Sequence, residues 1–132
     1  MSTKSVAEKL QTKPHTAVWL SHPARLGLIG PLPAGARLVD GPAEAATALV
    51  FADDTAALRA LLAAHRDHLA RPAALWVAYP KGNRADLNRD TVWPLLAEHG
   101  LRPIGQVAVD AVWSALRFRP LRPGEAPFAG RR

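Results

Sequence analysis

The sequence contains no cysteine, a single methionine, a single tyrosine and no long apolar run. The absence of cysteine excludes disulfide frameworks, thiolate metal sites and cysteine nucleophiles. No apolar run approaches the roughly 20 residues that a membrane-spanning helix needs, and residues 1–13 lack the apolar core of a signal peptide. We therefore expect a cytoplasmic protein of bacterial type with no membrane partner.

Length and charge indicate one globular domain with basic ends. The chain has 132 residues, of which 48% are hydrophobic and 21% charged, enough for one core and too few for two. The formal net charge is +6, yet residues 14–113 hold nine basic and nine acidic residues. We expect a short N-terminal helix or arm over 1–13, a single α/β domain over 14–120 and a flexible basic tail over 121–132.

Hydrophobic patterning predicts strands that alternate with helices. Ser5 and Glu8 have the spacing of a capping box for a helix over 5–11, and Asp54 is a suitable N-cap for a helix over about 54–69. Pro23 opens a short helix to about Ile29, and a third main helix ends at Gly100. This third helix is expected to start in one of two ways. Either Thr91 is its N-cap, or it starts at Asp86 and kinks at Pro94. Strands are expected at 16–20, 36–40, 48–52 and 74–79, followed by an antiparallel hairpin of 104–109 and 113–119.

This order predicts a three-layer α/β fold, with a mostly parallel sheet that ends in an antiparallel hairpin. The continuously apolar segment 74–79 indicates a central strand covered on both faces, so we expect Trp76 to be nearly fully buried. The link between the second and third strands is short for two parallel neighbours. Residues 41–47 join two strands, whereas a parallel crossover usually takes about a dozen residues or more.

Two stretches resemble a known family. The residues from Trp76 to Lys81 place Pro-Lys after an apolar strand, and those from Val109 to Phe118 carry an Asp-x-x-Trp-Ser-Ala-Leu hairpin. In both, the chain resembles a small family of bacterial proteins known as a domain of unknown function, over roughly residues 5–120. An acidic residue often follows the aspartate in that pattern, where this chain has Ala111. The family has no established activity, so the resemblance implies no reaction.

The order of elements also resembles the second half of a class I methyltransferase, a likeness of fold alone. Such enzymes place a Gly-x-Gly turn directly after their first strand, so that the backbone can approach the cofactor. Here Ser21, His22 and Pro23 follow the first strand, and no Gly-x-Gly occurs in the chain. Asp40 ends the second strand, where an acid can hold ribose hydroxyls. We predict no cofactor and do not expect S-adenosylmethionine to bind.

Candidate site residues follow from the polarity of a parallel sheet, because ligands gather at the carboxyl ends of its strands. Lys81 leaves a buried strand on the rigid Pro80, and Gly82 beside it allows close approach, which suits a phosphate or carboxylate. The competing interpretation is an ion pair of Lys81 with Asp110 or Asp86. The candidate ligand-binding residues at these strand ends are His22, Arg25, Asp40, Lys81, Asp86, Asp110, Trp113 and Ser114.

Several of these residues also have simpler interpretations. Asp86 suits the cap of the next helix, Trp113 suits the core, and His22 is either a general base or a solvated loop residue. His65 and His68 share one helix but lack a third ligand, so we predict no metal site. No serine–histidine–aspartate order, phosphate loop or pair of catalytic carboxylates is present, so the catalytic residues stay unknown.

Three functions remain open at this point. We favour a non-catalytic domain that binds a small anionic ligand or a protein partner, which includes a second copy of itself, at the carboxyl edge of the sheet. The first alternative is a degenerate or atypical methyltransferase-like enzyme, with His22 or Asp110 as the base. The second is a nucleic-acid-associated protein that uses Arg117, Arg119, Arg122 and the basic tail.

Overall fold

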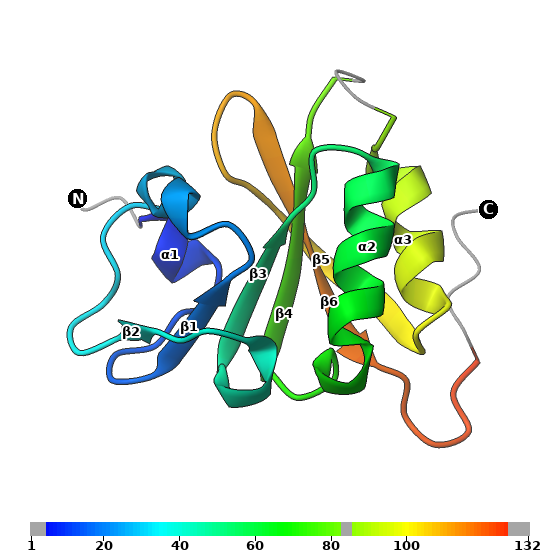
Figure 1. The fold of residues 1–132 in the computed structure, drawn as a ribbon, viewed down its shortest axis with the longest axis horizontal. Coiled ribbons are helices and arrows are strands. Elements are labelled where there is room, and N and C mark those ends of the chain that lie inside the picture. Colours follow the sequence, from blue (N-terminus) through cyan, green and yellow to red (C-terminus); the bar gives the residue numbers. More distant parts are fainter. Residues whose placement is uncertain (1–4, 83–85, 127–132) are drawn as a thin grey trace.

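The fold is built on one sheet of six strands. The computed structural model describes residues 5–82 and 86–126. Its strands are β1 (Ala17–Leu20), β2 (Arg37–Leu38), β3 (Thr47–Phe51), β4 (Ala74–Pro80), β5 (Leu101–Ala108) and β6 (Trp113–Pro120). They lie in the order β2-β1-β3-β4-β6-β5 (Figure 1). The pairs β1–β2, β1–β3 and β3–β4 are parallel, whereas β6 runs antiparallel to both β4 and β5. The predicted fold class is confirmed.

Helices cover both faces of this sheet (Figure 1). The α2 helix (Thr55–His65) and the α3 helix (Arg89–Ala97) pack on one face, where their leucines join a core with alternate residues of β4 and β6. The short α1 helix (Val6–Lys9) and the 3-10 turn η1 (Pro23–Leu28) cover the other face. Two further 3-10 turns are η2 (Pro42–Glu44) and η3 (Arg66–His68). Among the described residues, no helix is long and apolar enough to cross a membrane.

Local sequence signals placed most helix starts correctly. Ser5 and Glu8 form the predicted capping box, and the Asp54 carboxylate accepts the Ala57 N–H at 2.8 Å at the start of α2. The start of α3 differs from both predictions. Its N-cap is Asn88, which accepts from the N–H groups of Asp90 and Thr91, and Pro94 lies inside the helix.

The short link between β2 and β3 has a simple geometric explanation. β2 has only two residues, which pair with Ala17 and Val18, and β3 begins beside Val18 on the other side of β1. The link therefore crosses the start of β1 and does not travel back along the length of a strand. The predicted strand over 36–40 is correspondingly wrong in length, and both residues of β2 are exposed.

Both predicted terminal segments are attached to the sheet where the structure describes them. Ala7 and Leu10 of the arm are buried, and the Trp76 indole N–H donates to the Leu10 carbonyl at 2.8 Å. At the other end, the Glu125 carboxylate lies 2.7 Å from the guanidinium groups of both Arg102 and Arg119. Residues 1–4 of the arm and 127–132 of the tail lie outside the described residues.

The position of β6 fixes which strand ends meet. Because β6 is antiparallel to β4 and to β5, β5 points the same way as β1, β3 and β4. We call the edge where these four strands end the carboxyl edge and the opposite one the amino edge. The Lys81 N–H donates to the Val112 carbonyl at 2.7 Å. The predicted shared edge for Lys81 and the hairpin turn is confirmed.

Candidate ligand-binding site at the carboxyl edge

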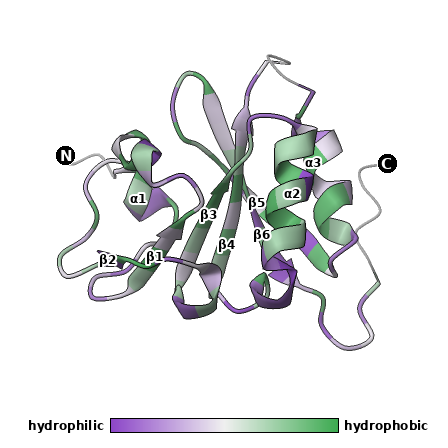
Figure 2. Ribbon diagram, in the orientation of Figure 1, coloured by the Kyte–Doolittle hydropathy of each residue, from purple (hydrophilic) through white to green (hydrophobic). Residues whose placement is uncertain are grey.

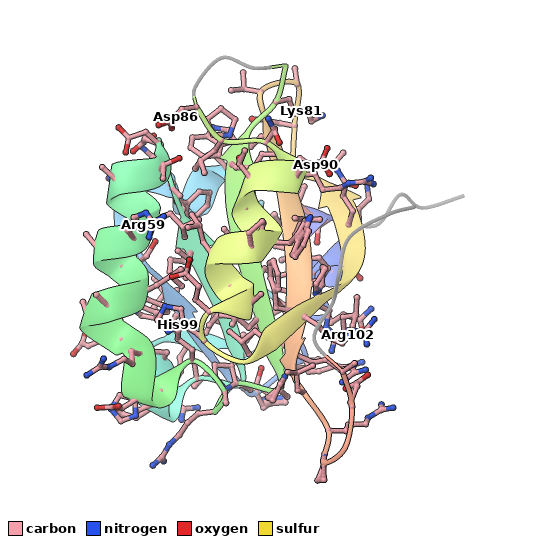
Figure 3. All side chains as sticks on the ribbon, turned by 90° about the vertical axis from the view of Figure 1, so that its right-hand side faces the viewer. Arg59, Lys81, Asp86, Asp90, His99 and Arg102 are labelled. Carbon is pink, nitrogen blue, oxygen red and sulfur yellow. The ribbon has the colours of Figure 1, made fainter. Side chains whose placement is uncertain are left out.

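A hollow of about 480 Å³ lies at the carboxyl edge, between the ends of β4, β5 and β6. It is lined by Tyr79, Lys81, Gly82, Gln106, Ala108 and Ser114. Among the described residues of this lining, Lys81 is the only charged one, and Gly82 has a φ of +68°, a conformation that glycine adopts without strain. Figure 3 shows Lys81 at the same end of the molecule as Asp86 and the start of α3.

One amide organises the polar side of the hollow. The Gln106 Nε2 group donates to the Tyr79 hydroxyl at 3.2 Å and to the Ser114 hydroxyl at 3.0 Å. Both hydroxyl oxygens therefore act as acceptors, and their own hydrogens point elsewhere. Ser114 donates to the Val107 carbonyl at 3.5 Å, whereas the Tyr79 hydrogen meets no acceptor within the described residues. The hollow thus offers a hydroxyl donor beside an ammonium group, a donor set that suits an anion.

Two predicted residues gather on the other face of the sheet. The Arg25 guanidinium lies 4.9 Å from the centre of the Trp113 ring, within the range of a cation–π contact. Its Nη2 also donates to both carboxylate oxygens of Asp53, at 3.0 and 3.1 Å. The Phe51 ring meets Trp113 edge to face at 5.6 Å. This cluster ties η1 to the end of β3.

Strand geometry explains why the predicted residues separate into two groups. Trp113 and Ser114 are neighbours on β6, and successive side chains of a strand point to opposite faces. Ser114 therefore joins Lys81 in the hollow on the α2/α3 side, while Trp113 joins Arg25 on the α1 side. The groove predicted for Lys81, Asp110 and Ser114 contains only Lys81 and Ser114 among its lining residues.

The remaining candidates hold the backbone or stand apart. The Asp110 carboxylate accepts from the N–H groups of Val112 and Trp113, which shapes the hairpin turn. Asp86 accepts the Thr55 N–H at 2.7 Å, so it supports the start of α2 and does not cap α3 as predicted. His22 is exposed at the start of η1. Asp40 is exposed and follows a strand that reaches only the beginning of β1.

Tyr79 and Gln106 line the hollow but are not among the residues predicted from the sequence. Tyr79 was counted as part of an apolar strand, and Gln106 lies in a strand of no special composition. A signal was available for Gln106, because in the predicted hairpin Ala108 pairs with Ser114 and Gln106 pairs with Leu116 on the same face; the pairing of Tyr79 with Ser114 depends on the strand order. Residues that share a face of a sheet differ by two along each strand, so Ser114 indicates Gln106 but not Tyr79.

The described residues of the carboxyl edge are acidic overall. Five of the seven aspartates follow the ends of β3, β4 or β5: Asp53, Asp54, Asp86, Asp90 and Asp110. The described cations at this edge are Arg25, Lys81 and Arg89. Most of these aspartates accept backbone N–H groups or pair with Arg25. The edge therefore suits a small ligand of low charge and repels a polyanion.

Similarity to solved structures concerns the fold. The chain is similar to the crystal structure of a Streptococcus pneumoniae protein described as a candidate tRNA (m1A22) methyltransferase, with a TM-score of 0.57 and 11% sequence identity. The similarity covers 93% of this chain and 70% of that one. A methyltransferase-like fold is thereby confirmed. No family model matches the chain, and no curated protein matches it in sequence. Membership of the domain-of-unknown-function family stays a prediction.

Proposed function

We propose that this chain is a methyltransferase-like α/β domain that binds a small carboxylate or phosphate ligand in the hollow at its carboxyl edge. The observation that supports this proposal is the set of donors around the hollow. Lys81 supplies one ammonium group, and the Tyr79 hydroxyl has a hydrogen to donate because Gln106 already occupies its oxygen. Charge-assisted hydrogen bonds of this kind contribute about 1.5–3 kcal/mol each.

The charge of the surrounding edge sets the expected preference. One ammonium group balances one negative charge, and the nearby aspartates disfavour a second. We therefore expect a monocarboxylate to bind more tightly than the phosphate dianion. Asp110, Asp86 and Trp113 act in this proposal as supports of the backbone and the core, and not as ligand contacts.

The proposal is tested by titrating the protein with acetate and with inorganic phosphate, followed by NMR chemical shifts. Lys81→Gln should weaken binding about tenfold, since about 1.4 kcal/mol corresponds to a factor of ten. Lys13→Gln removes the same charge from an exposed site before β1 and should leave binding unchanged. Shifts that do not saturate, or that Lys81→Gln leaves unaltered, would refute the proposal.

A second candidate, methyl transfer, is suggested by the similar solved structure, but the residues after β1 do not fit S-adenosylmethionine. Rossmann-like folds admit a nucleotide at this point through a glycine turn. In this chain the Ser21 hydroxyl accepts the Phe51 N–H at 2.7 Å, and Arg25 is bonded to Asp53. Side chains of the protein thus join the ends of β1 and β3. We derive no methyl-transfer step and expect no saturable binding of this cofactor by calorimetry.

A further inference from the structure

The amino edge of the sheet carries a second polar surface, unrelated to the hollow. Six arginines lie in segments that begin or end there in the β4, β5 and β6 half of the sheet: Arg66 and Arg71 before β4, Arg102 at the start of β5, Arg117 and Arg119 on β6, and Arg122 after it. Figure 3 shows Arg102 toward the end of the molecule opposite Lys81. Figure 2 shows strongly hydrophilic residues in the turn below α2. We call these six residues the arginine edge.

Strand pairing brings the two halves of the arginine edge together. Phe118 pairs with Leu75, so the chain after Phe118 runs beside the residues that precede Leu75. The Arg117 guanidinium reaches the Ala73 carbonyl at 3.4 Å, two residues from Arg71. Neighbouring strands lie about 5 Å apart. The segment before β4 and the end of β6 therefore lie side by side at the amino edge, although they are far apart in the sequence, and Arg117 itself lies over Trp76 on the α1 face.

Few acidic residues balance this surface. Glu125 pairs with Arg102 and Arg119, and Glu98 lies 3.9 Å from Arg59. Asp67 lies in the turn that leads to β4, and Asp40 and Glu44 lie in the link that leads to β3 at the same edge. In the parts of the chain that the structure describes, no ion pair involves Arg66, Arg71, Arg117 or Arg122. Arg66, Arg71 and Arg122 are also exposed to solvent. The arginine edge thus has a clear positive excess, while the carboxyl edge has a negative one.

In the part of the chain that the structure describes, the arginine edge has charge but no exposed phenylalanine, tyrosine or tryptophan ring. The Trp76 ring lies under Arg117, 6.0 Å from its guanidinium, but Trp76 is 2% exposed and cannot stack with a base. Arginine binds phosphate through paired N–H groups, and phosphate contacts carry no sequence information. We propose that the arginine edge binds the phosphate backbone of nucleic acid, without sequence preference and independently of the hollow at the carboxyl edge.

The test is the salt dependence of binding to a fluorescein-labelled DNA duplex of about 20 base pairs, measured by anisotropy with the full chain. If four arginines each neutralise one phosphate, the logarithm of the binding constant falls with the logarithm of the salt concentration at a slope of about −3.6. Arg66→Gln combined with Arg71→Gln should reduce this slope to about −1.8. Both side chains are exposed, so the fold should not change.

The matched control is Arg59→Gln combined with Arg89→Gln, which removes the same charge from exposed sites outside the arginine edge. It should leave the slope unchanged, as should Lys81→Gln, which affects only the proposed carboxylate site. An equal loss with the control pair would overturn the proposal, because net charge alone would then explain binding. Two other results would also overturn it: binding that requires only residues 127–132, or binding to phosphatidylserine vesicles in place of the duplex.

Discussion

Replacing Trp76 tests how β4 is joined to the N-terminal segment. Trp76→Phe keeps most of the apolar ring but removes the indole N–H that donates to the Leu10 carbonyl at 2.8 Å. Leu10 is 1% exposed, so its carbonyl loses this donor in the interior. Leaving a buried acceptor unpaired costs about 1–3 kcal/mol. Trp76→Ala opens a cavity as well and should cost about 3–5 kcal/mol.

Urea unfolding followed by far-UV circular dichroism measures these losses without relying on tryptophan fluorescence. Val77→Ala is the matched control, because Val77 is equally buried on the same strand but faces α2 and α3. It should cost about 1–2 kcal/mol without loosening the N-terminal segment. Trypsin cleavage after Lys9 under native conditions should therefore accelerate in Trp76→Phe and not in Val77→Ala.

Either of two results would refute this role of the Trp76 indole N–H. A cost below about 0.5 kcal/mol for Trp76→Phe would mean that the bond to Leu10 contributes nothing beyond what water supplies to the unfolded chain. Equal cleavage rates in both variants would mean that residues 5–12 are held by their apolar contacts alone.

Three further predictions concern single interactions. A double-mutant cycle with Arg25→Gln and Asp53→Asn should give a coupling of about 0.5–1 kcal/mol that shrinks in high salt, because both side chains are partly exposed; a salt-independent value would contradict this. Asp86→Ala should destabilise the protein by about 1 kcal/mol through the loss of the bond to Thr55, while acetate binding in the hollow stays unchanged. The Arg119 guanidinium and the Arg122 N–H hold the pKa of the Glu125 carboxyl well below its ordinary value of 4.5. The ionised Glu125 carboxylate therefore makes its full contribution to the free energy of unfolding at neutral pH, and this contribution is lost only as the pH falls below that ordinary value. Carbon-13 NMR of the Glu125 carboxyl should show this low midpoint and a rise in Arg119→Gln.

Elements that depend on residues close together in the chain could be predicted from the sequence. The apolar run of β4, the Asp54 cap and the hairpin with Asp110 at its turn depend on residues a few positions apart, and the structure contains all three. The strand order could not be predicted in the same way. A hairpin can join a sheet by either of its strands, and only tertiary packing decides that β6 takes the place beside β4.

In the candidate site, too, the local sequence predicts some features and tertiary contacts decide the others. Lys81 is predicted because it follows a buried strand, a signal within the local sequence, and it lines the hollow. The partner of Asp86 was missed because Thr55 lies 31 residues away, and a carboxylate before a helix looks like the cap of that helix. Arg25 was placed at the correct edge, but its contacts with Trp113 and Asp53 depend on how η1 folds over β3.

The interior position of β6 affects the order in which the protein can form during synthesis. Until Pro120 leaves the ribosome, β4 has a partner only on its β3 side, and β5 has no strand to join. An apolar strand with an unpaired edge can pair with a strand of another chain and so aggregate. A nascent chain is exposed to such aggregation until β6 has been synthesised. Ribosomes that stall before residue 113 should therefore carry a chain that depends on chaperones, and release of the last strand should end that dependence.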